Sequence, residues 1–136
     1  MRIASSLLVA TFISGCSSFT NTSAPSPVFP STESVAQVGG SPSGPISDGE
    51  KISQLMSALR EVNEGWYYTW HTYPSPQASL MLLDSSGHAI CRVDFGPNWL
   101  GSTCGHSKPG WPPMATVSGD QARNFRNLVG GKWEVK

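Results

Sequence analysis

The sequence is poor in charge: Asp, Glu, Lys and Arg make up 13% of its 136 residues, and the formal net charge at pH 7 is zero. It contains no cluster of basic residues, so the chain lacks the field that drives phosphate binding, and we expect no nucleic-acid partner. No apolar stretch reaches the roughly 20 residues that span a bilayer, and no internal repeat is visible.

Motifs of enzyme chemistry are also missing, because the chain has no G-x-S-x-G, no H-E-x-x-H and no phosphate-binding glycine loop. Its carboxylates are scattered, and a count of unpaired acids is weak support for acid–base catalysis. Solvated or capped side chains explain the three histidines better than metal binding does. The sequence therefore indicates no catalytic residue, no metal site and no cofactor.

What the sequence does contain begins with an export signal over residues 1–15. Arg2 supplies a positive charge, residues 3–13 form an apolar core, and Ser14 and Gly15 are small residues that a signal peptidase accepts. The core is too short for a transmembrane helix. The chain is therefore expected to leave the cytoplasm.

The sequence Ile13-Ser14-Gly15-Cys16 resembles the lipobox of bacterial lipoproteins. The resemblance implies that the Cys16 thiol receives a diacylglycerol, that the peptide is cut before this Cys, and that the freed amine is acylated, as with palmitate. Two or three acyl chains hold a protein stably on a membrane. Ser17 in place of Asp resembles the signal for the outer membrane, facing the periplasm. The alternative is an ordinary secretory signal with a chance Cys.

Residues 16–47 are dominated by Ser, Pro, Thr and Gly. Such a segment has too little apolar surface to offset the entropy of ordering it, so we expect a disordered tether. A flexible coil of about 30 residues would span roughly 30 Å on average. A peptide motif recognised by a partner is the alternative to a plain spacer.

Residues 48–136 are expected to form one small α+β domain. Ser47 to Glu50 has the form of a capping box, and apolar residues then recur at helical spacing over residues 48–63. A second capping box at Ser118 to Gln121 begins a short C-terminal helix. We expect the domain to combine these two helices with one small antiparallel sheet.

The sheet is expected to be a four-stranded antiparallel meander, with a loop following it from 105 to 117. Its strands are expected at residues 66–73, 78–83, 88–95 and 99–104. Trp133 and Val135 have the spacing of a short last strand, which could add to the sheet edge.

Apart from Cys16 of the lipobox, the chain has two cysteines. We expect these two, Cys91 and Cys104, to form a disulfide in an oxidising compartment. If Pro97 and Asn98 form the centre of a hairpin, the two cysteines face each other directly. A metal site formed by both cysteines with His106 is one alternative. A catalytic thiol at Cys104 is the other.

The same register sorts side chains by face. The expected core face carries Leu80, Leu82, Ala89, Cys91, Val93, Phe95, Leu100 and Cys104, and the opposite face carries Met81, Leu83, Ile90, Arg92, Asp94 and Trp99. The face that each aromatic residue of 66–73 occupies is left open.

Aromatic density is the most distinctive feature of the domain. Large aromatic residues fill small cores, and they also form the energetic centres of interfaces and stack on sugars. The candidate binding residues are Trp66, Trp70, Trp99, Trp111 and Arg92.

From these observations we expect a lipid-anchored envelope protein whose periplasmic domain binds or helps assemble a partner. That partner is an envelope protein or peptidoglycan, and inhibition of a wall-degrading enzyme is one version of the role. A small enzyme acting on the cell wall and a purely structural lipoprotein are the alternatives.

Overall fold

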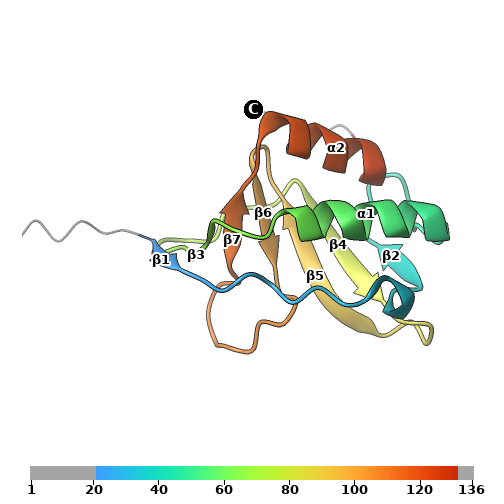
Figure 1. Cartoon of the computed structure of the whole chain (residues 1–136), viewed down its shortest axis with the longest axis horizontal. Coiled ribbons are helices and arrows are strands. Elements are labelled where there is room, and N and C mark those ends of the chain that lie inside the picture. The colour runs from blue at the N-terminus through green and yellow to red at the C-terminus, as the bar shows by residue number, and fades with distance from the viewer. Residues whose placement is uncertain (1–20, 132–136) are drawn as a thin grey trace, which may run out of the picture.

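A computed structural model describes residues 21–131, which form an antiparallel sheet of seven strands and two helices (Figure 1). The strands are β1 (Thr22–Ser23), β2 (Gln37–Gly39), β3 (Trp66–Tyr68), β4 (Ala78–Leu83), β5 (Ala89–Phe95), β6 (Trp99–Ser102) and β7 (Met114–Thr116). The helices are α1 (Gly49–Glu61) and α2 (Gly119–Val129), with a 3-10 turn η1 at Thr32–Ser34. Across the sheet the order is β1-β3-β7-β6-β5-β4-β2. Within the described range, no helix is both long and apolar enough to cross a membrane.

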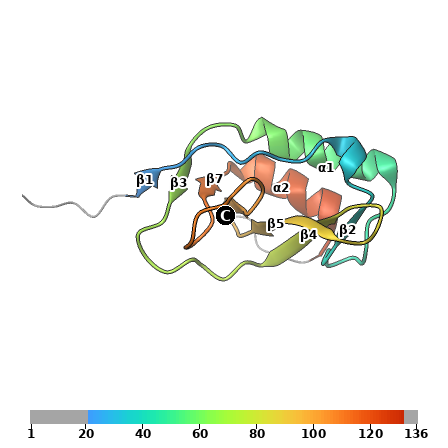
Figure 2. The same cartoon turned by 90° about the horizontal axis from the view of Figure 1, so that it is seen from below.

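Both helices lie on one face of the sheet (Figure 2). Each presents an apolar stripe to it, with Leu55, Met56 and Leu59 of α1 and Phe125 and Val129 of α2 all buried. Apart from Ala89, the residues expected on the core face of the sheet are buried in the same hydrophobic core as these stripes. The aromatic rings of Phe95 and Phe125 approach to 5.0 Å between centroids. The opposite, outer face of the sheet carries no helix (Figure 2).

The helix ends follow local capping chemistry. Asp48, rather than the expected Ser47, is the N-cap of α1, and its carboxylate accepts from the backbone N–H groups of Glu50 and Lys51. A carboxylate one residue closer to the first turn reaches these donors and also suits the positive helix end. The capping box of α2 is confirmed, with Ser118 and Gln121 bonding reciprocally.

The expected four-stranded meander is wrong, because the sheet has seven strands and β3 is not next to β4. β3 pairs with β7 and β1 instead, with Trp66 opposite Ala115. The strand expected over 66–73 ends at Tyr68. Residues 69–77 leave the sheet there and return at β4, while β7 forms inside the segment 105–117 that was expected to be a loop.

The expectation of a disordered tether is wrong for residues 21–47, which supply both edge strands. Val35, Val38 and Ile46 are buried, and Val38 pairs with Leu82 of β4. The domain therefore begins well before residue 48. The Ser, Pro and Gly content hid these few apolar residues, each of which occupies a position where a neighbouring strand or helix can cover it.

The hairpin between β5 and β6 agrees with the sequence prediction. Phe95 faces Leu100, and a disulfide joins Cys91 to Cys104 with their Cα atoms 5.0 Å apart. The other hairpin differs in one detail, since a bulge pairs Leu83 with Ala89 and leaves Ala89 exposed instead of in the core.

Four sequence predictions lie wholly or partly outside the described residues. They are the export signal over residues 1–15, the lipobox at Cys16, the tether over residues 16–20, and the last strand at Trp133 and Val135.

Candidate functional site

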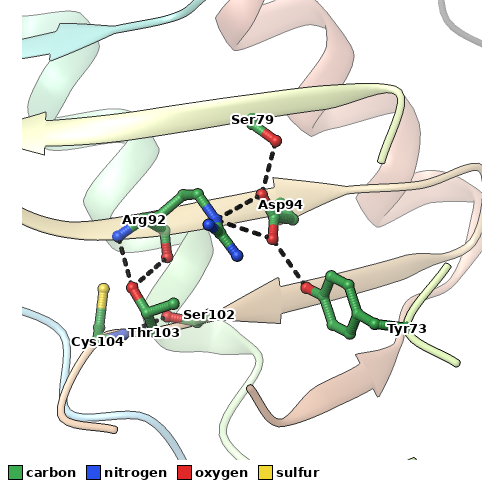
Figure 3. A network of polar contacts seen from close by, with 7 residues as sticks. All are labelled: Tyr73, Ser79, Arg92, Asp94, Ser102, Thr103 and Cys104. Carbon is green, nitrogen blue, oxygen red and sulfur yellow. Dashed lines mark hydrogen bonds and ion pairs between the residues drawn. The ribbon is translucent and has the colours of Figure 1, made fainter. Parts of the chain in front are cut away.

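A buried carboxylate stands at the centre of the outer face of the sheet (Figure 3). Asp94 of β5 is 2% exposed. Its Oδ1 accepts a hydrogen bond of 2.7 Å from the Ser79 hydroxyl, and its Oδ2 accepts one of 2.9 Å from the Tyr73 hydroxyl. The Arg92 Nε lies 3.1 Å from both carboxylate oxygens. Three side chains thus compensate a charge that burial would otherwise destabilise.

The strand register explains why these groups meet. Ser79 lies directly opposite Asp94 on β4, and Arg92 lies two residues before it on the same face of β5. Gly101 lies opposite Asp94 on the other side, in β6. A Cβ at Gly101 would stand 1.9 Å from the Tyr73 hydroxyl oxygen, so the missing side chain leaves the space through which Tyr73 reaches the carboxylate.

The network has a clear effect on protonation. Burial is the largest cause that raises the pKa of Tyr73, followed by the negative charge of Asp94 and the hydrogen bond to it, while Arg92 acts in the opposite direction. The phenol therefore stays protonated and remains a donor at all physiological pH values. Asp94 is enclosed by donors and shielded from solvent, an arrangement that suits a structural anchor more than a general base.

Tyr73 also organises three aromatic rings on the outer face. Its ring stacks on Trp111 with centroids 5.6 Å apart and planes 18° apart. The edge contact with Trp99 has a centroid distance of 5.5 Å and an angle of 76°. Trp99 is 8% exposed and Trp111 is 53% exposed. We call Tyr73, Trp99 and Trp111 the aromatic platform. The buried ring of Trp99 and the hydrogen-bonded Tyr73 support the ring of Trp111, which faces solvent.

The five candidate binding residues separate into three groups. Trp99, Trp111 and Arg92 come together, because the first two touch Tyr73 and the third touches Asp94. Trp66 is instead a core residue, 3% exposed, and its Nε1 donates to the Val62 carbonyl oxygen over 2.8 Å.

Trp70 belongs to neither the core nor the aromatic platform. It is 58% exposed and lies at the end of the sheet near Asn21, whose Oδ1 accepts from the Trp70 backbone N–H over 3.4 Å. Its ring meets His71 edge-on, with centroids 5.3 Å apart.

Sequence reasoning did not identify Tyr73, Ser79 and Asp94 as site residues. The hairpin register held a usable signal for two of them, since it places Ser79 and Gly101 on either side of Asp94. Tyr73 had no such signal, because it lies in a loop whose path depends on the whole sheet.

Cys91, Cys104 and His106 do not form the metal site or the catalytic thiol that the sequence left as alternatives. The two sulfur atoms are bonded to each other, so neither thiol is a nucleophile or metal ligand in this structure. Across residues 21–131 no group of three or more His, Cys, Asp or Glu residues could hold a metal ion. His106 lines a cavity of about 160 Å³ beside Tyr68 and Pro27, and its Nε2 is buried without a hydrogen-bond partner.

No protein-family model matches the chain, and no curated protein or solved structure is significantly similar to it.

Proposed function

We propose that the protein is a lipid-anchored component of a bacterial cell envelope whose domain binds an envelope partner through the aromatic platform. The location rests on the export signal and the lipobox-like sequence that ends at Cys16. The binding role rests on one observation, the half-exposed Trp111 ring held parallel to Tyr73.

The contacts of Tyr73 explain why the Trp111 ring that stacks on it suits recognition. Its hydroxyl is tied to Asp94, and its ring is packed between two tryptophans. A side chain already held in one conformation loses little further freedom when a partner binds. Flat rings of this kind supply large contact areas to proteins and to sugar rings. The Arg92 side chain, 42% exposed beside the buried carboxylate, adds polar donors.

The partner class follows from the proposed location. Trp111 lies in the loop between β6 and β7 and is exposed, so the platform presents an open contact surface. An envelope protein or the glycan of peptidoglycan would bind to that surface. Inhibition of a wall-degrading enzyme is one form that such binding would take. A wall-acting enzyme is less well supported, since the buried carboxylate of the site is enclosed by three donors.

Site-specific photocrosslinking in the native host tests this proposal. A photoreactive amino acid replaces Trp111 in the full-length protein, and the matched control replaces Ile90, which is 40% exposed on β5 outside the platform. We expect a discrete crosslink to an envelope protein or a muropeptide from position 111 only. The same products from both positions, or none from position 111, would contradict a binding role for the platform.

A further inference from the structure

The end of the sheet where β1 pairs with β3 lies very near the proposed lipid anchor. Only five residue steps separate Cys16 from Asn21, and a fully extended chain covers at most about 3.6 Å per residue, or roughly 18 Å here. Thr22 and Ser23 form the edge strand β1, with Thr22 opposite Tyr68. If Cys16 carries lipid, this end of the domain is held within that distance of the bilayer surface.

Three segments meet at this end of the molecule. β1 pairs with β3, and the cavity beside the disulfide is lined by Pro27, Tyr68 and His106, one residue from each segment. Trp70 lies two residues after the end of β3, and its backbone N–H donates to Oδ1 of Asn21 over 3.4 Å. Figure 1 shows β1 and β3 side by side, away from the ends of β4 and β2. The backbone N–H of Val28 also donates to the Cys104 carbonyl oxygen, and we call residues 21–28, 65–72 and 104–108, which these contacts join, the acid-free segments.

The charge distribution sets these segments apart. None of the nine Asp and Glu residues of the chain lies within them, although they contain Lys108, His71 and His106. A carboxylate next to anionic lipid headgroups would be repelled, whereas a Lys near such a surface is attracted to it. An anionic membrane would therefore meet no carboxylate of these segments.

The same segments carry the most exposed apolar side chains. Val28 is 74% exposed and Trp70 is 58% exposed, the two highest values among the large hydrophobic residues that the structure leaves in solvent. Tryptophan prefers the membrane–water interface, where its ring lies among the headgroups and its N–H stays hydrated. A single Lys provides little electrostatic attraction, so the indole supplies most of the contact.

We propose that the indole of Trp70 inserts into the headgroup region of the bilayer that holds acylated Cys16, so that the domain lies against the membrane by its β1–β3 end. The inference rests on the proposed lipidation of Cys16. It replaces the picture of a domain standing about 30 Å from the membrane on a flexible tether. The aromatic platform, on the outer face of the sheet, then faces the periplasm at a fixed height.

Fluorescence quenching by brominated lipids tests the contact. Full-length lipidated protein is incorporated into vesicles of phosphatidylethanolamine and phosphatidylglycerol, with or without bromine on the acyl chains near the headgroups. We expect bromine to quench the tryptophan emission of the natural protein, and Trp70→Ala to remove most of that quenching. The matched control Trp111→Ala removes a similarly exposed indole from the platform, and bromine should still quench the emission of this variant.

Flotation of the vesicles separates the two hypotheses. If the protein floats with the vesicles but Trp70→Ala and the natural protein are quenched equally, Cys16 is anchored and the docking proposal is wrong. If the full-length protein does not float, both the anchor and the docking are wrong. A second readout needs no substitution: on vesicles, amide hydrogen exchange of residues 66–73 should slow in the lipidated protein and stay unchanged in unlipidated Cys16→Ser. Equal exchange in both proteins also refutes docking.

Discussion

The hydroxyl of Tyr73 donates a hydrogen bond to Oδ2 of Asp94 over 2.9 Å, and this contact joins a long loop to the middle of the sheet. The loop of residues 69–77 connects β3 to β4, which are separated in the sheet by β7, β6 and β5. It must therefore cross one face of three strands. Tyr73 ties the loop down where it passes Asp94, and the same contact orients the ring that supports Trp111.

Replacing Tyr73 with Phe should remove this tie while keeping the stacked ring. A hydrogen bond to a charged group contributes about 1.5 to 3 kcal/mol, so we expect the free energy of unfolding in urea to fall by about that amount at pH 7. Tyr67→Phe is the matched control on β3 and should change it by less than about 0.5 kcal/mol. Equal losses in the two variants would show that the Tyr73–Asp94 contact has no special weight.

The loss of stability caused by Tyr73→Phe should depend on pH. The pKa of Tyr73 is raised in the folded state, mainly by burial and then by Asp94, whereas an unfolded tyrosine titrates near pH 10. Above about pH 10 the unfolded state releases the proton and the folded state keeps it, so stability falls as pH rises, by up to about 1.4 kcal/mol per pH unit. Tyr73→Phe lacks this titration. The stability gap between the two proteins should therefore narrow above pH 10, and a constant gap from pH 7 to 11 would contradict the shift.

Gly101→Ala tests the space that Tyr73 occupies. The added Cβ would lie 1.9 Å from the Tyr73 hydroxyl oxygen and should push the loop off the sheet. Overpacking of this kind costs about 1 to 3 kcal/mol, measurable as a lower midpoint in thermal unfolding. Gly49→Ala is the matched control, because no heavy atom lies within 4 Å of its added Cβ. Stability unchanged in both variants would mean that the loop does not need this gap.

The disulfide should contribute strongly to a domain of this size. Cys91 and Cys104 are 13 residues apart, and in the chain-entropy model a bridge closing a loop of this length stabilises by about 3 kcal/mol. The double variant Cys91→Ala, Cys104→Ala should lose about 2 to 4 kcal/mol in urea unfolding. Thiol alkylation of this pair in the natural protein should require prior reduction, and labelling without reductant would show that the bridge is not formed.

Removing the residues before Ser47 should destabilise the domain. The deletion takes away β1 and β2 together with the buried Val35, Val38 and Ile46. Burying one such side chain contributes about 1.5 to 3 kcal/mol, so the loss is comparable with a typical total stability of about 5 to 15 kcal/mol. We expect the thermal unfolding transition, monitored by circular dichroism, to lose its cooperativity. A variant beginning at Asn21 is the control, and equal midpoints for the two would restore the tether hypothesis.

Several features follow from the sequence because they depend on nearby residues. The apolar spacing predicts both helices, and the capping pattern of α2 is confirmed at Ser118. The alternation of β5 and the turn at Pro97 and Asn98 set the register that brings Cys91 to Cys104. In these cases every deciding interaction lies within one helix or one hairpin, so the local pattern carries the whole signal.

Tertiary structure alone decided which strands complete the sheet and which aromatic residues reach solvent. β1, β2 and β7 have two or three residues each, too few for a period, and β1 pairs with β3 more than 40 residues later in the chain. Trp66 and Trp70 share one aromatic run, yet the first is buried and the second is exposed because the chain leaves the sheet between them. Short strands of this kind form only when distant partners supply hydrogen bonds and cover, and that information is not present in the local sequence.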